Sequence, residues 1–137
     1  AVEIYAFPGE DHKMRFAKTP FKITIKNGHV QEGDFPPEFA PLVEMMKGEN
    51  ADGNIPVREF GLGLNRAITA QNKLTEATAF ERVTGLHLSL GMKHGVYQKK
   101  FKKQKDIQQR FHVDIFPDVK KIWLNDTLIF ESGKFVV

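Results

Sequence analysis

The chain has 137 residues, of which 41% are hydrophobic, and a formal net charge of +3. This length fits one domain with its own core, so we expect residues 1–137 to form a single domain. The absence of cysteine excludes disulfides and thiolate metal sites, and leaves His, Asp and Glu as the side chains that could hold a metal. The apolar runs are too short to cross a bilayer. We therefore expect a cytoplasmic protein without a membrane partner.

No signal peptide is visible at the start of the chain, which opens on Ala1 without an initiator methionine. We expect either a processed protein or part of a longer one.

The first third of the chain is predicted to be rich in β-structure. Residues 21–30 contain an alternating F-K-I-T-I-K run followed by a tight-turn pair, Asn27-Gly28, and the start of a return strand. Apolar residues at helical spacing over 39–46 predict a short helix that Gly48 ends.

The middle of the chain carries two further strand patterns. Residues 57–65, V-R-E-F-G-L-G-L-N, are too rich in glycine for a regular helix and predict a strand in close contact with other backbone. One or two helical turns, capped by Thr75 or Thr78, are predicted to run through Phe80 and Val83 and to end at Gly85, before an alternating strand at 86–91.

The end of the chain adds a strand, F-H-V-D-I-F at 111–116, and a hairpin around Asn125-Asp126. Together these elements predict an α+β domain, with a mixed or antiparallel sheet and a few short helices.

Four polar residues interrupt strands that would otherwise be apolar. His112 and Asp114 are two positions apart, and on a strand such residues point to one face at about 6.5 to 7 Å, so both can bind one ion. Alone, this short motif is more typical of a strand face in water. Glu59 and His87 are polar residues in two other predicted strands. The four together are candidate metal ligands.

Four segments in order resemble the metal-binding segments of the thermophilic-type aminopeptidases, the leucyl aminopeptidase or aminopeptidase T family of metallopeptidases. They are P-G-E at 8–10, R-E-F-G-L-G-L-N at 58–65, E-R-V-T-G-L-H-L-S-L-G at 81–91 and F-H-V-D at 111–114. The resemblance covers nearly all of this chain but only the later part of a family enzyme, which has an additional N-terminal domain.

The resemblance implies one or two divalent ions (Zn, Co, Mn or Fe) held by five residues: Glu10, Glu59, His87, His112 and Asp114. It implies hydrolysis of a peptide or amide bond by a metal-activated water, with Glu59 also moving a proton. The tyrosine that the family has seven positions after its strand histidine is replaced here by His94. This histidine either adds a ligand or replaces a proton donor.

Two other functions stay open from sequence. One is a non-haem Fe(II) dioxygenase resembling the 2,5-dihydroxypyridine dioxygenases, which would need two histidines and a carboxylate. The other is a noncatalytic accessory domain that binds a peptide. The lysine-rich run at 97–105 is interpreted as a solvated loop and not as a nucleic-acid surface. The expected partners are a peptide or small-molecule substrate, and either a second copy of the chain or a missing N-terminal domain.

Overall fold

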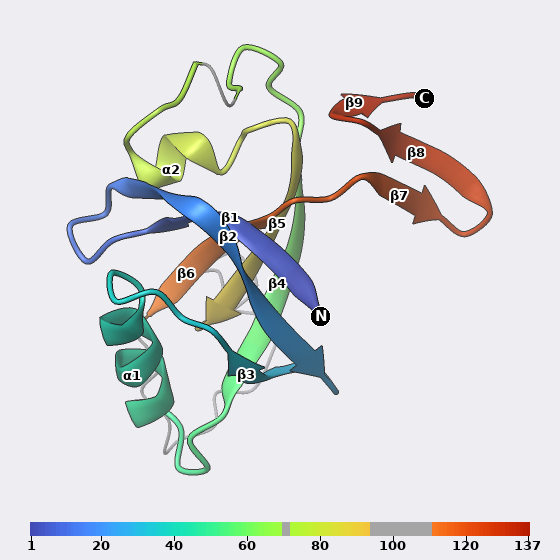
Figure 1. Ribbon diagram of the computed structural model, residues 1–137. Coiled ribbons are helices and arrows are strands. Elements are labelled where there is room, and N and C mark those ends of the chain that lie inside the picture. Colours follow the sequence, from blue (N-terminus) through green and yellow to red (C-terminus); the bar gives the residue numbers. More distant parts are fainter. Residues whose placement is uncertain (70–71, 94–110) are drawn as a thin grey trace.

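Six antiparallel strands close into a barrel in the computed structural model, which describes residues 1–69, 72–93 and 111–137 (Figure 1). Each strand pairs with the next along the chain, and the last pairs with the first. The strands are β1 (Val2–Pro8), β2 (Met14–Lys26), β3 (His29–Gly33), β4 (Ile55–Gly63), β5 (Gly85–Gly91) and β6 (His112–Pro117).

The predicted α+β class is wrong, because strands make up 53% of the structure and helices 11%. The two helices in the described part of the chain are α1 (Ala40–Gly48) and α2 (Ala77–Phe80), and both are short. The physical reason is closure of the sheet. A sheet that curls on itself fills its interior with its own side chains, so it needs no layer of helices to cover it.

Several local predictions are confirmed. The hairpin of β2 and β3 turns at Asn27 and Gly28, whose φ angles of 51° and 75° suit a tight hairpin turn. The predicted helix is α1. The glycine-rich strand is β4, and a Cβ on its Gly63 would lie 1.9 Å from the carbonyl oxygen of Val83, so close backbone contact requires glycine there.

The predicted threonine cap of the second helix is wrong. The residue at the N-cap of α2 is Glu76, in extended conformation, and no side chain caps the helix. The helix is held by packing, since its Phe80 is buried.

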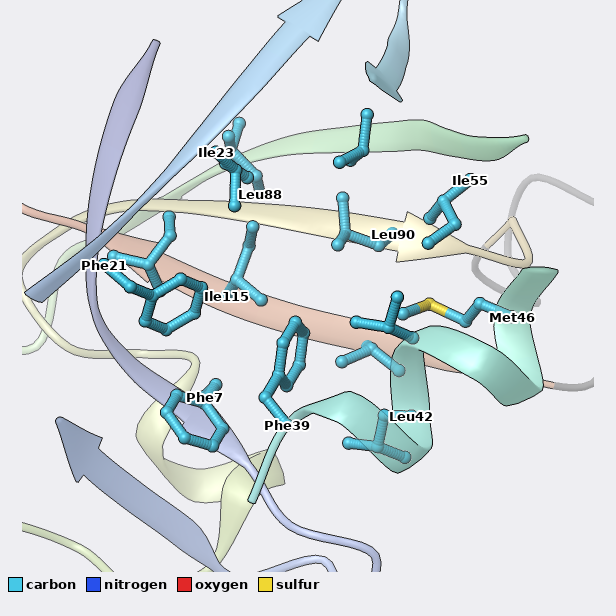
Figure 2. Close-up of a cluster of buried hydrophobic side chains, with 14 residues drawn as sticks. Phe7, Phe21, Ile23, Phe39, Leu42, Met46, Ile55, Leu88, Leu90 and Ile115 are labelled. Atoms are coloured by element: carbon cyan, nitrogen blue, oxygen red, sulfur yellow. The ribbon is translucent and has the colours of Figure 1, made fainter. Parts of the chain in front are cut away.

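The barrel interior is filled by inward side chains from all six strands and from α1 (Figure 2). Phe7, Phe21 and Phe39 form an aromatic group with ring centroids 5.0 to 5.8 Å apart. Leu42 and Met46 of α1 reach the same core. In Figure 1, α1 lies below the barrel, between β3 and β4 along the chain.

A second apolar cluster lies on the opposite face of the strands. Phe116 of β6 follows the inward-facing Ile115, so its ring points the other way and packs against Phe80 of α2 at a centroid distance of 4.8 Å. Met14 and Val83 are buried in the same cluster. It therefore anchors α2 to the outside of the barrel.

The C-terminal segment forms a separate three-stranded sheet beside the barrel (Figure 1). The predicted hairpin around Asn125-Asp126 is present as β7 (Lys121–Leu124) and β8 (Thr127–Glu131), and β9 (Lys134–Phe135) extends it. Within the ranges described, no helix is long and apolar enough to cross a membrane.

Candidate functional site

Strand register gathers polar side chains on the outer face of β4, β5 and β6. Glu59 lies opposite Ser89, and Ser89 lies opposite Asp114, which makes a row across three strands. His87 lies two positions before Ser89 on β5, and His112 lies two positions before Asp114 on β6. Because these strands are antiparallel, the two histidines lie on opposite sides of the row. The alternate residues of β5 and β6 point into the barrel core. We call Glu59, His87, Ser89, His112 and Asp114 the outer-face cluster.

A β-bulge at Arg58 turns Glu59 toward this cluster. Val57 pairs with Leu90 and Glu59 pairs with Ser89, so β4 uses one more residue than β5 over the same interval. Residues two apart on a regular strand share a face, yet Val57 packs against the core while Glu59 lies on the outer face. The extra residue reverses the alternation, as bulges beside functional sites commonly do.

His112 and Asp114 form an ion pair inside the cluster. The Nε2 atom of His112 lies 3.3 Å from Oδ1 of Asp114, and the side chains are 21% and 15% exposed. The Nδ1 atom of His112 lies 2.7 Å from the carbonyl oxygen of Met92, which fixes the ring orientation. Ser89 donates its hydroxyl to Oδ1 of Asp114 at 2.5 Å.

These contacts shift both pKa values toward the charged forms. The close contact with Asp114 raises the pKa of His112 to about 9, against the opposing effect of burial and with help from the Met92 carbonyl. Burial by itself would raise the pKa of Asp114, but contacts from His112 and Ser89 outweigh it and hold that pKa below its usual value. Without a metal, this pair is therefore ionised at neutral pH.

His87 and Glu59 form a second pair. The Nε2 atom of His87 lies 3.8 Å from Oε1 of Glu59. The His87 ring lies over Gly61, where a Cβ would be only 2.1 Å from Nε2, so the glycine makes room for the ring. Oε2 of Glu59 is buried and, among the described residues, has no hydrogen-bond partner. A buried carboxylate oxygen of this kind is costly unless something binds it.

The donor atoms of the cluster are of the types that bind a divalent metal, but not all the distances between them are short enough for ligands of one ion. Two imidazoles and two carboxylates are suitable donors for Zn, Mn, Co or Fe(II). Bonds of about 2.0 to 2.2 Å place two ligands of one ion about 2.8 to 3.6 Å apart, for ligand–metal–ligand angles between about 90° and the tetrahedral value. The His112–Asp114 distance meets this requirement and the His87–Glu59 distance is longer. Within the chain as described, no three His, Asp or Glu side chains already surround one point closely enough.

Four of the five predicted ligands thus lie on one face of the sheet. The fifth, Glu10, makes no contact with them among the interactions of the described residues. Glu10 lies exposed in the turn between β1 and β2. His94 lies outside the described residues, as does the lysine-rich run at 97–105.

Two residues of the site were missed from sequence. The alternation of β5 puts Ser89 on the same face as His87, but its bond to Asp114 depends on the pairing of β5 with β6. Arg58 creates the bulge, and its Nε donates to the carbonyl oxygen of Gly91, opposite His112. Register across strands was the missing signal in both cases.

Comparisons with protein-family models, with curated proteins and with solved structures found no match.

Proposed function

We propose that this chain is a metal-dependent hydrolase that cleaves a peptide or amide bond at the outer-face cluster. The observation that carries the proposal is the gathering of Glu59, His87, His112 and Asp114 on one face of three neighbouring strands, with one carboxylate oxygen buried and unbonded among the described residues. A purely structural ion pair seldom leaves such an oxygen, because most buried polar atoms in proteins have a hydrogen-bond partner.

Within this proposal, His112 and Asp114 are the firmest ligands. The carbonyl of Met92 holds Nδ1 of His112 and so directs Nε2 toward Asp114. Backbone carbonyls commonly orient ligating histidines in this way. Ser89 likewise fixes the Asp114 carboxylate through its hydroxyl. His87 and Glu59 complete the donor set from the adjacent pair.

A bound divalent ion would supply a water of lowered pKa and would polarise the carbonyl to be attacked. We assign to Glu59 the role of accepting the proton of the attacking water, because its side chain is 28% exposed. The protonated carboxyl group can then return that proton to the leaving amine. Binding of a metal by His112 requires loss of the proton that Asp114 otherwise stabilises.

The test combines metal content and hydrolysis. Protein stripped with a chelator is reloaded separately with Zn, Co, Mn or Fe(II), desalted, and assayed by elemental analysis and by release of amines from a peptide library. We expect one or two ions per chain and amine release. Glu59→Gln should lower kcat at least 100-fold, while His29→Gln, a strand histidine outside the cluster, should leave activity unchanged.

The same assay separates the alternative functions. One iron per chain with oxygen consumption and no amine release would favour the dioxygenase, for which His87, His112 and Asp114 supply the two histidines and one carboxylate. No metal retained under any condition would contradict both enzymatic functions.

A further inference from the structure

Among the described residues, the strand that carries Glu59 has a free edge, and we use that name for the β4 backbone from position 58 to position 63 on the side away from β5. On its β3 side, β4 pairs only through Ile55 and Pro56, and the N–H of Val57 bonds to the carbonyl of Gly28. From position 58 to position 63, the described structure pairs β4 with β5 alone. The backbone groups that point away from β5 over these residues are available to another strand.

The side chains on this edge are apolar and unprotected. Phe60, Leu62 and Leu64 are 61%, 40% and 69% exposed. Natural edge strands usually carry lysine, proline or inward charges that prevent pairing. Between positions 59 and 64 the one charged side chain is Glu59, and the bulge turns it to the other face. An edge of this kind is suited to accept an extended chain.

The apolar area on this edge is small for a dimer. From typical side-chain areas of 150–250 Å², the exposed parts of the three side chains amount to on the order of 300 Å². A standard interface buries about 800 Å² on each partner. A short peptide, whose affinity comes mainly from backbone hydrogen bonds and two or three side chains, fits the edge better than a second copy does.

We propose that the free edge of β4 binds the substrate as an extended peptide that adds a strand beside Glu59, with apolar side chains against Phe60 and Leu62. The inference rests on the proposed function, because it treats the peptide as the substrate. Neighbouring strands lie about 4.8 Å apart, so a peptide on this edge passes within reach of the Glu59 carboxylate. Its alternate side chains stand on the sheet face that carries Glu59 and on the opposite face, which carries Phe60 and Leu62.

The test measures peptide binding on chelator-treated protein, so that hydrolysis plays no part. The probe is a blocked seven-residue peptide of alternating valine and threonine, titrated by calorimetry. Two versions of it, N-methylated on odd or on even residues, remove the donors of one edge or the other. We expect one N-methylated version to bind at least tenfold more weakly and the other to bind like the parent.

Two variants of the protein provide the second arm. Leu62→Lys and Phe60→Lys should each weaken binding at least tenfold, while Leu124→Lys, which alters a leucine that is 65% exposed on β7, should not. Thermal melts confirm that each variant is folded, and the N-methylated peptides test the edge without altering the protein.

Three results would overturn the inference. The first is equal binding of both N-methylated peptides and the parent, and the second is unchanged binding by Leu62→Lys. The third is a wild-type dimer in light scattering that Leu62→Lys dissociates, since a second copy would then occupy the edge. Binding that depends on Leu62 in a protein without hydrolysis under any metal would contradict the proposed hydrolase alone. Hydrolysis with a KM unaffected by Leu62→Lys would contradict the edge site alone.

Discussion

His112 is held at both ring nitrogens, by the Met92 carbonyl at Nδ1 and by Asp114 at Nε2. The same ring orientation suits both the metal-free and the metal-bound state of His112. Without a metal, both nitrogens carry protons and the ring is a cation beside a carboxylate. With a metal, Nδ1 keeps its proton and its bond to Met92, and Nε2 becomes a ligand. The surroundings of His112 therefore keep the ring in the orientation that metal binding requires.

This pair makes the stability of the metal-free protein depend on pH. The folded pKa of His112, about 9, is above the ordinary value of 6.5. The pair's stabilisation is therefore complete below pH 6.5 and is lost as the pH rises through 9. The loss should be about 1 kcal/mol after allowance for solvent screening.

Urea unfolding between pH 6 and 9.5, in the presence of chelator, measures this loss. His112→Gln should flatten the dependence, and His29→Gln should follow the wild type. Parallel curves for His112→Gln and the wild type would show that the pair contributes nothing.

Gly61 determines where the His87 ring can lie. A methyl group at this position would sit 2.1 Å from Nε2 of His87, so Gly61→Ala should displace the ring. Overpacking of this kind costs about 1 to 3 kcal/mol of unfolding free energy. We expect that loss in urea unfolding, with metal affinity at least tenfold weaker in calorimetry.

The matched control is Gly48→Ala at the end of α1, where an added Cβ meets nothing within 4 Å and φ is not positive. This variant should retain both stability and metal affinity. Normal metal affinity in Gly61→Ala would show that His87 is not a ligand.

Among the elements, β4 shows most clearly what a sequence can and cannot predict. Its alternation of Phe60, Leu62 and Leu64 against Glu59 and glycines correctly predicts a strand with two different faces. The same pattern does not show that Val57 faces the core. On a regular strand Val57 and Glu59, which are two positions apart, would share a face, and only the bulge puts them on opposite faces. The bulge follows from pairing with β5, which is distant in sequence.

The bulge gives a prediction at the scale of the element. Deleting Arg58 removes the extra residue and leaves Val57 and Glu59 as neighbours on a regular strand, where they keep Leu90 and Ser89 as partners and point to opposite faces. We therefore expect metal binding to be retained, with a loss of at most about 1 kcal/mol in urea unfolding from the missing bond to the Gly91 carbonyl.

Arg58→Ala keeps the chain length and therefore the bulge. It should cost at most about 1 kcal/mol, chiefly from the lost bond to the Gly91 carbonyl. Loss of metal binding on deletion of Arg58 but not in Arg58→Ala would contradict this register, because Glu59 would then depend on the extra residue for its position.

At the scale of the whole molecule, closure of the barrel has two consequences. It explains why the fold class was predicted wrongly, and it explains why the predicted site residues lie on one face. Alternating strands were recognisable one by one, but closure of the barrel pairs β6 with β1, which are far apart in sequence. That closure places Ser89 beside Asp114 on the outer face, next to the position where α2 packs on Phe116. Short motifs identified candidate donors, whereas their convergence depended on topology.

The barrel should fold without the C-terminal sheet. Both apolar clusters are built from residues between Ile4 and Phe116, and the six barrel strands end at Pro117. Removing residues 119–137 should therefore leave a cooperative thermal transition and a β-type circular dichroism spectrum. Loss of the cooperative transition would show that the small sheet is part of the barrel's folding unit.

The central claim is that the outer-face cluster binds a divalent metal. The most direct measurement is elemental analysis of protein that has been stripped, reloaded and desalted, comparing the wild type with a variant carrying His87→Gln and His112→Gln together. Our account predicts one or two ions per wild-type chain and none in the double variant. A wild-type chain that retains no metal, or a double variant that retains as much as the wild type, would contradict it.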